Sequence, residues 1–387
     1  MKTEFAERVK NLPPYLFAEI ERLIKEKKAQ GVDLISLSIG DPDLPPPRFV
    51  IDALKEEVAD LKNHSYSFSQ GEPDFRQAVS EWYEKRFHVE FDQDQVVALL
   101  GSKEGLANIG RAFLNRNDRV LVPDPAYPVY ANGTTILNEA VPIPMPLLEE
   151  NGFKPDFDAI STEKVKMMFL NYPNNPTAAT VDMEFLREAV DFATDNEIIL
   201  CYDNAYSEVS FDGYKPPSIL EIDGSMDVAI EFNSCSKTFN MTGDRIAFAV
   251  GNREIISGLT KVKSQVDSGP PVYIQKVAAK ALQSYVSDEF PEFLKKNNQI
   301  YAERRNILVE HLCQMGFECD KPKATFYVWA KHKSNSMEFA TRLLDVGVAV
   351  TPGIGFGSHG ESYARFALTQ PKERIEEACR RISMLFE

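Results

Sequence analysis

The sequence predicts an α/β fold in which a mostly parallel sheet lies between helices. The middle of the chain repeatedly places a short apolar run before a turn and a segment with helical periodicity. The apolar runs VVALL, VKMMFLNY and EIILCY, for example, precede GSKEGLANIGRAFL, MEFLREAVDFAT and DNAYSEV. Such runs are typical of strands buried on both faces, and their alternation with helices indicates parallel pairing.

The length of 387 residues indicates two domains. Residues 46–279 contain the alternating pattern and form the predicted large domain. Residues 280–387 form most of a smaller α/β domain, because ATFYVWA, MEFATRLLDVG, VAVTPG and ARFALT alternate strand and helix patterns. We expect residues 1–45 to join this smaller domain.

Several individual elements follow from periodicity. A helix is predicted over residues 15–30, followed by LISLSIG as a strand. A second helix is predicted over residues 75–87, and a long helical region over residues 272–314. The helix over residues 75–87 has one apolar stripe, which consists of Val79, Trp82, Tyr83 and Phe87.

Charge and composition exclude several classes of function. The formal net charge is -15, whereas nucleic-acid-binding proteins cluster Lys and Arg. No stretch reaches the roughly 18 uninterrupted apolar residues of a membrane helix, and the start MKTEFAERVKNLPP lacks the apolar region of a secretory signal. We therefore expect neither a nucleic-acid nor a membrane partner.

The cysteines predict a reduced, cytoplasmic protein. Their number is odd, and no C-x-x-C pair occurs, which favours neither a disulfide framework nor a metal site. We interpret them as small hydrophobic residues of the core. They are Cys201, Cys235, Cys313, Cys319 and Cys379.

The stretch FNSCSKTFNMTGDR, residues 232–245, carries most of the chemical information. Ser234, Ser236 and Lys237 follow an apolar run, and Arg245 lies a short loop later. A lysine amine can condense with an aldehyde, while hydroxyls and a guanidinium can hold a phosphate. The alternative is an ordinary polar loop with a surface lysine, because short motifs often match by chance.

Polar residues after other apolar runs suit the same ligand, because ligands bind beyond the carboxyl ends of parallel strands. Asp203 directly follows a strand and could pair with a protonated pyridine nitrogen, keeping that ring electron-poor. Asn175 and Tyr206 could donate hydrogen bonds to a phenolate oxygen on the ring. As alternatives, Asp203 could cap a loop, and the other two could be turn or packing residues.

Further segments could complete such a site. In GSKEG, residues 101–105, backbone N–H groups and the Ser102 hydroxyl could bind phosphate, although the turn is equally a plain helix cap. Tyr127 could stack on a flat ring or pack in the core. Arg365 lies in an otherwise apolar strand, where its guanidinium suits an α-carboxylate or an internal salt bridge.

Taken together, these motifs resemble those of the class I/II aminotransferases of fold type I, which use pyridoxal 5'-phosphate. The resemblance implies that the large domain has a mostly parallel sheet of the seven-stranded type between helices, beside a smaller α/β domain. The resemblance runs from NLPPYLF to the last predicted helix, and the order of the motifs is that of the family. Each motif is a weak signal, but the ordered set is a strong one. The motifs are Y-x-x-x-x-G at 66–71, G-S-K-E at 101–104, P-x-Y at 125–127, N-P-T at 175–177, D-x-x-Y at 203–206, S-x-S-K at 234–237, R at 245 and R-F at 365–366.

The resemblance implies roles for the matching residues. Lys237 would hold the cofactor as a Schiff base and move the proton during amino transfer. The remaining cofactor contacts would come from Ser102, Lys103, Tyr127, Asn175, Asp203, Tyr206, Ser234, Ser236 and Arg245. The substrate contacts would come from Tyr15, Gly40, Lys103, Tyr127, Asn175 and Arg365, the last on the α-carboxylate. Tyr66 would reach the phosphate in the neighbouring subunit, which implies a homodimer.

Within the family, segments such as NLPPYLF, SIGDPDLP and SKTFNMTGDRIAFAVGN look most like the LL-diaminopimelate aminotransferases of lysine biosynthesis. This similarity implies amino transfer from LL-diaminopimelate to 2-oxoglutarate, run physiologically toward diaminopimelate. The segment VDSGPPVYIQ contains no arginine, which disfavours a dedicated aspartate enzyme. The chain departs from the wider family at Ala178, Asn204 and Asp244, and an inward-pointing Asp244 would weaken phosphate binding by Arg245.

Other functions stay open on the sequence alone. The chain could be an aminotransferase of other or broader specificity, or a β-lyase that cleaves a carbon–sulfur bond and releases pyruvate and ammonia. A non-catalytic ligand sensor of this fold would carry a DNA-binding domain before it. We do not expect one, because the resemblance starts within the first dozen residues and Lys237 is present.

Overall fold

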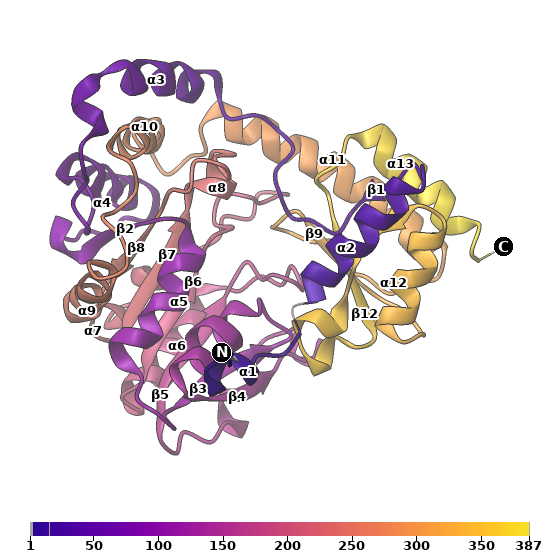
Figure 1. Cartoon of the computed structure of the whole chain (residues 1–387), viewed down its shortest axis with the longest axis horizontal. Coiled ribbons are helices and arrows are strands. Elements are labelled where there is room, and N and C mark those ends of the chain that lie inside the picture. The colour runs from indigo at the N-terminus through magenta and orange to yellow at the C-terminus, as the bar shows by residue number, and fades with distance from the viewer. Residues whose placement is uncertain (1–2, 15, 387) are drawn as a thin grey trace.

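The computed structural model describes residues 3–14 and 16–386 and has a seven-stranded sheet at its centre (Figure 1). The strand order is β2-β8-β7-β6-β5-β3-β4, in which β8 alone is antiparallel to its neighbours. The predicted mostly parallel sheet is therefore confirmed. Its strands are β2 (Val96–Leu99), β3 (Arg119–Asp124), β4 (Val141–Pro146), β5 (Val165–Asn171), β6 (Ile199–Asp203), β7 (Ala229–Ser234) and β8 (Ala247–Gly251).

Helices cover both faces of this sheet (Figure 1). One face packs against α4, α6 and α10, and the opposite face packs against α5 and α9. The helix predicted over residues 75–87 is confirmed as α4. The helices of this part are α3 (Arg48–Ala59), α4 (Pro73–Phe87), α5 (Ser102–Phe113), α6 (Met183–Asp195), α7 (Ser225–Val228), α8 (Cys235–Thr238), α9 (Arg253–Lys263) and α10 (Val272–Leu282).

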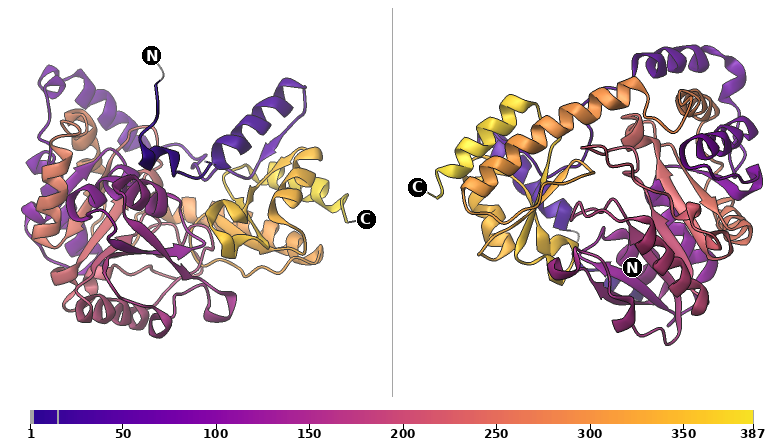
Figure 2. Two further views of the ribbon diagram at one scale, coloured as in Figure 1. Left: turned by 60° about the horizontal axis from the view of Figure 1, so that its bottom comes forward. Right: turned by 180° about the vertical axis from the view of Figure 1, so that it is seen from behind.

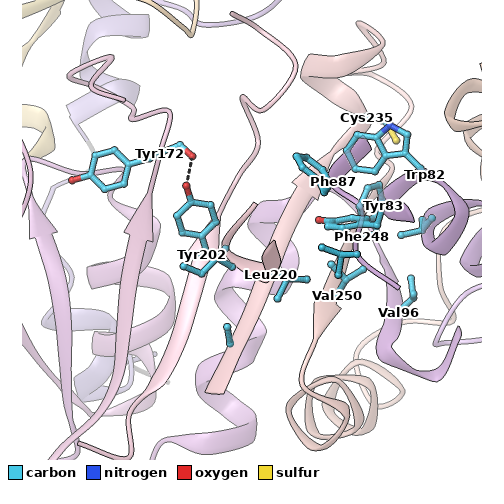
Figure 3. Packing of buried hydrophobic residues seen from close by; sticks show 14 of the residues in the cluster. Trp82, Tyr83, Phe87, Val96, Tyr172, Tyr202, Leu220, Cys235, Phe248 and Val250 are labelled. Atoms are coloured by element: carbon cyan, nitrogen blue, oxygen red, sulfur yellow. Dashed lines mark hydrogen bonds between the residues drawn. The ribbon is translucent and has the colours of Figure 1, made fainter. Parts of the chain in front are cut away.

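Side-chain alternation along the strands builds the two cores. On β2, Val96 packs into one cluster while its neighbour Val97 packs into the other, as the period of two in a strand requires. Figure 3 shows Trp82 and Tyr83 of α4 beside Phe248 of β8. The Trp82 and Phe248 rings meet edge to face, with centroids 5.9 Å apart, so the predicted apolar stripe of α4 is the stripe that faces the sheet.

The C-terminal part forms a smaller layer with its own core. Strands β11, β12 and β9 make an antiparallel sheet, and β1 pairs in parallel with β10. Seen from behind in Figure 2, the long helix α11 runs from the large sheet to this layer. The elements are β1 (Ile35–Ser36), α2 (Leu16–Ala29), α11 (Glu292–Gln314), β9 (Tyr327–Lys331), α12 (Ser336–Asp345), β10 (Val348–Ala349), β11 (Thr351–Pro352), β12 (Tyr363–Ala367) and α13 (Lys372–Ser383).

Some predicted elements differ from those observed. The helical region predicted over residues 272–314 is interrupted between α10 and α11, where Pro291 precedes the first turn of α11. The segment DNAYSEV is a buried turn and not a helix, because Tyr206 and Val209 pack into the C-terminal core. The strand predicted in LISLSIG extends over residues 35–36 only.

The domain division stays a prediction in its details. The proposed boundary between residues 279 and 280 falls inside α10, which packs against α3 and α4. The short helix α1 (Glu7–Lys10) contacts residues 136–138 beside the large sheet. None of the helices in the described part combines the length and apolarity that crossing a bilayer requires.

Candidate active site

A cavity of about 310 Å³ lies at the carboxyl edge of the large sheet, facing the C-terminal layer. The strands β5, β6 and β7 each deliver a polar residue to it at or near the strand end: Asn171, Asp203 and Ser234. Parallel strands favour this placement, because their carboxyl ends meet at one edge. The predicted residues that line the cavity are Gly40, Ser102, Lys103, Tyr127, Asn175, Asp203, Tyr206, Ser234, Ser236, Lys237, Arg245 and Arg365.

Lys237 is held in α8, directly after β7. Its Nζ donates a 2.9 Å hydrogen bond to the carbonyl oxygen of Gly40. Burial lowers the pKa of the amine to about 8; Asp41 opposes this shift, and Arg365 and Arg245 add to it. The uncharged fraction of the amine near neutral pH is therefore larger than for an ordinary lysine, and a nucleophile or proton acceptor must be uncharged.

Asp203 ends β6 and is 5% exposed. Its Oδ2 accepts a 2.7 Å hydrogen bond from the Tyr130 hydroxyl, whereas its buried Oδ1 accepts none from the described residues. Burial raises the pKa of this carboxyl to about 6, against the lowering effect of Tyr130. A buried carboxylate oxygen without a donor suits a cationic N–H group of a ligand.

Gly101 and Arg245 approach each other closely at the start of α5. A Cβ atom on Gly101 would lie 2.2 Å from Nη2 of Arg245, and the backbone here has φ +90°. Glycine satisfies both the lack of space for a side chain and the positive φ angle. Arg245 is fixed by hydrogen bonds of 2.9 Å from Nη1 to the Thr242 carbonyl and 3.2 Å from Nη2 to the Leu100 carbonyl.

Hydroxyl groups line the same cavity as this guanidinium and offer an anion cradle. Ser102 is the first residue of α5, whose N-terminal N–H groups lie at the cavity. Ser234 and Ser236 come from the end of β7 and from α8, and the Ser234 hydroxyl accepts a 3.2 Å hydrogen bond from the Ser236 amide. A helix N-terminus, hydroxyls and a guanidinium are the donors that a phosphate group prefers.

Arg365 reaches the cavity from the opposite side, on β12 of the C-terminal layer. Its side chain is 4% exposed, with hydrogen bonds of 2.6 Å from Nη1 to Asn175 Oδ1 and 2.7 Å from Nη2 to the Ser38 carbonyl. The guanidinium also lies 4.1 Å from the ring centroid of Tyr327 and 4.8 Å from that of Phe356. These contacts hold its plane rigidly, as bidentate carboxylate binding requires.

Some residues of the cavity were not predicted from the sequence. Tyr130 and Asn171 had a usable signal, since Tyr130 follows the Tyr127 motif and Asn171 ends an apolar strand as Asp203 does. Asn171 links neighbouring groups, because it donates a 2.7 Å hydrogen bond to the Asp203 carbonyl and accepts one of 2.8 Å from the Asn175 amide. The others had no local signal: Ile20, Glu21, Ser38, Ile39, Ala205, Thr242, Tyr327 and Thr351.

One predicted residue of the described part does not line this cavity, and another cannot be placed. Tyr66 is 92% exposed and does not line the cavity of its own chain, and Tyr15 falls outside the described residues. Asp244, the carboxylate next to Arg245, is not among the lining residues. Its predicted interference with the anion cradle therefore has no support in the cavity lining.

The lining fits one kind of ligand, a flat phosphorylated aldehyde with a protonated ring nitrogen. Asp203 presents an oxygen without a donor, and Lys237 presents an amine of lowered pKa. Gly101, which has no side chain, leaves the space beside Arg245 that an anion needs. Tyr127, whose ring centroid lies 5.7 Å from Nζ of Lys103, adds an aromatic wall. Pyridoxal 5'-phosphate has each of the features that these groups would bind.

Comparisons with known proteins agree with this chemistry. A family profile described as aminotransferase class I and II matches residues 32–382. LL-diaminopimelate aminotransferases from Desulforudis audaxviator and Aquifex aeolicus are 48% and 47% identical, covering 97% and 99% of this chain and 96% and 99% of those proteins.

A solved structure, substrate-bound BacF from Bacillus subtilis, is similar with a TM-score of 0.93 and 36% identity. The match covers 100% of this chain and 98% of that one. Fold type I is therefore confirmed together with the α/β class. The chain belongs to the class I and II aminotransferase family, whose members are enzymes that depend on pyridoxal 5'-phosphate.

Proposed function

We propose that this aminotransferase moves an amino group between LL-diaminopimelate and 2-oxoglutarate in lysine biosynthesis. Relatives that carry the name LL-diaminopimelate aminotransferase support this substrate, because they match over nearly the whole chain at 45–48% identity. The observation that carries the catalytic part is that Lys237, with its lowered pKa, and Asp203, with an open acceptor, line one cavity.

The lining residues suggest how the cofactor is held. When bound, pyridoxal 5'-phosphate supplies an aldehyde that condenses with amines and a ring that withdraws electrons from the adjacent carbon. We assign Asp203 to the ring nitrogen, Asn175 and Tyr206 to the ring oxygen, and Tyr127 to the ring face. The phosphate would be bound by Ser102, the Lys103 backbone, Ser234, Ser236 and Arg245.

Lys237 is the group that we propose to move the proton. Its lowered pKa leaves Nζ partly uncharged near neutral pH, so that Nζ can accept the proton from the substrate α-carbon and return it within the same turnover. Arg365 would bind the α-carboxylate with its planar fork and so fix which C–H bond faces Nζ. Gly40 and Lys103 are proposed as further substrate contacts, as predicted from the sequence.

We also propose a homodimer in which Tyr66 serves the site of the neighbouring subunit. Tyr66 is 92% exposed, and Leu61 and Phe68 of the same segment are 86% and 65% exposed. Exposed large apolar side chains favour a protein partner, and a twofold dimer is the commonest oligomer of a single kind of chain. A cytoplasmic location is proposed as well and is supported by the free thiols of the described cysteines.

A panel of amino donors tests the proposed substrate. The enzyme loaded with pyridoxal 5'-phosphate is given 2-oxoglutarate and one donor at a time, including LL- and meso-diaminopimelate, and glutamate is measured with a coupled assay. We expect LL-diaminopimelate to give the highest kcat/KM of the panel. Glutamate formation from other donors but not from LL-diaminopimelate would contradict the substrate, and pyruvate release without an oxo acid would support the β-lyase alternative.

A further inference from the structure

Diaminopimelate carries an ammonium and a carboxylate at each end, and only the reacting end has partners so far. Arg365 is assigned to the near carboxylate, and the near amine is the group transferred. The distal ammonium requires an acidic partner if the enzyme is to select this donor over one that lacks it. This inference rests on the proposed function and concerns that distal partner.

The charges that one subunit places around the cavity leave one candidate within that subunit. Among the described residues that line it, the acidic side chains are Asp203 and Glu21, and the basic ones are Lys103, Lys237, Arg245 and Arg365. Asp203 is buried at the end of β6 and is assigned to the ring nitrogen. Glu21 alone remains as a carboxylate of the described lining that a substrate ammonium could use.

Helix α2 explains why Glu21 lies at the cavity. Ile20 and Ile24, one turn apart, are buried against Leu344 and Ala349 and fix this helix on the C-terminal layer. At about 100° per residue, Glu21 then lies at the edge of the buried stripe, where α2 borders the cavity. The side of α2 on which the exposed Glu21 lies is therefore set by the apolar contacts of its neighbour Ile20.

The other acidic residues of α2, Glu19 and Glu26, have partners on the solvent side. Arg22 forms ion pairs with Glu19 and Glu26, both through its guanidinium. Glu21, by contrast, makes no ion pair with any residue that the structure describes. A carboxylate that stays outside the surface ion-pair ladder of its own helix and borders a cavity rich in cations is suited to a cationic group of a ligand.

We propose that Glu21 binds the distal ammonium of the amino donor and thereby selects diamino dicarboxylates over donors that lack this ammonium. The basic residue Lys103 lines the same cavity, so the cavity offers opposite charges to the two distal groups. The bond that Glu21 makes is formed only with the second amine present, and it acts on selectivity rather than on proton transfer.

The test compares two substrates that differ in one group. Glu21→Gln is assayed with LL-diaminopimelate and with L-2-aminopimelate, which has the same chain and distal carboxylate but no distal ammonium. We expect kcat/KM for LL-diaminopimelate to fall about 5- to 20-fold, as loss of a charged hydrogen bond between the exposed Glu21 and the bound substrate predicts. The kcat/KM for L-2-aminopimelate should stay within about twofold.

Glu26→Gln is the matched control, because it removes the same charge from the solvent side of α2. It should leave both values unchanged. An equal loss for both donors in Glu21→Gln, or no loss for either, overturns the assignment of Glu21. If the unaltered enzyme turns over L-2-aminopimelate but not LL-diaminopimelate, the proposed substrate itself has failed, which is a separate result.

Discussion

The Tyr130 hydroxyl donates a 2.7 Å hydrogen bond to Oδ2 of Asp203 and so gives the two carboxylate oxygens different roles. The Tyr130 ring is itself fixed, since it stacks on Phe169 with centroids 4.9 Å apart. Oδ2 is thereby bound to the protein, and Oδ1 is the oxygen that a ligand can use. The tyrosine also opposes the effect of burial on the pKa of Asp203.

This relationship predicts different effects for two substitutions. Asp203→Asn removes the charge opposite the ring nitrogen and should lower kcat by about 10²- to 10³-fold, the usual effect of losing a preorganised electrostatic partner. Tyr130→Phe leaves the charge but removes one donor, and should lower kcat by less than about tenfold. The measurement is kcat from steady-state kinetics of both variants, loaded with pyridoxal 5'-phosphate. A larger loss of kcat in Tyr130→Phe than in Asp203→Asn would contradict this account.

The lowered pKa of Lys237 predicts a pH dependence of stability in the protein without cofactor. Between about pH 8 and the ordinary lysine pKa of 10.5, the unfolded chain keeps the proton on this amine and the folded chain has lost it. The free energy of unfolding attributable to Lys237 therefore rises with pH in this window. Urea unfolding of Lys237→Met should lack this rise relative to the unaltered chain, and parallel curves for the two proteins would contradict the lowered pKa.

Arg365 is predicted to act through geometry as well as charge. Arg365→Ala leaves the α-carboxylate without its partner. The binding free energy of amino donors should weaken by several kcal/mol, which would appear as a higher KM. Arg365→Lys restores a charge but not the fork held by Asn175 and Tyr327, so only part of the affinity should return. A KM that is unchanged in the alanine variant would contradict the assigned role.

Hybrid dimers test the proposed role of Tyr66. Neither Lys237→Ala nor Tyr66→Ala should be active as a pure homodimer. After mixing and subunit exchange, a hybrid would contain one site with Lys237 from one subunit and Tyr66 from the other, both intact. We expect partial recovery of activity in the mixture. No recovery, with exchange confirmed by native mass spectrometry, would indicate that Tyr66 does not serve the neighbouring site.

The parts of the fold and site that follow local sequence rules were predictable. The strands of the large sheet are short apolar runs, and Asp203 and Ser234 could be located because they end such runs. Helix α4 was predictable from its apolar stripe. These features depend on neighbours within a few residues, which is the range over which periodicity carries information.

The remaining parts depend on contacts between distant segments. The hydroxyl oxygens of Tyr327 and Tyr206 lie 3.0 Å apart, although the residues are 121 positions apart in the sequence. No local feature of ATFYVWA indicates this contact. DNAYSEV has helix-like spacing, but burial of Tyr206 and Val209 in the C-terminal core makes it a turn. From the sequence alone, Glu21 is an ordinary charged residue of an amphipathic helix. Its place at the cavity depends on the packing of Ile20 against the C-terminal layer.

The most direct test identifies the lysine that is bonded to the cofactor. The loaded enzyme is reduced with borohydride, which makes the bond between amine and cofactor permanent, and is then digested and analysed by mass spectrometry. We predict that the added mass lies on the peptide that contains Lys237, and that Lys237→Ala loses it while a Lys103→Ala control keeps it. Added mass on Lys103 or on any other lysine of the unaltered enzyme would contradict the central assignment.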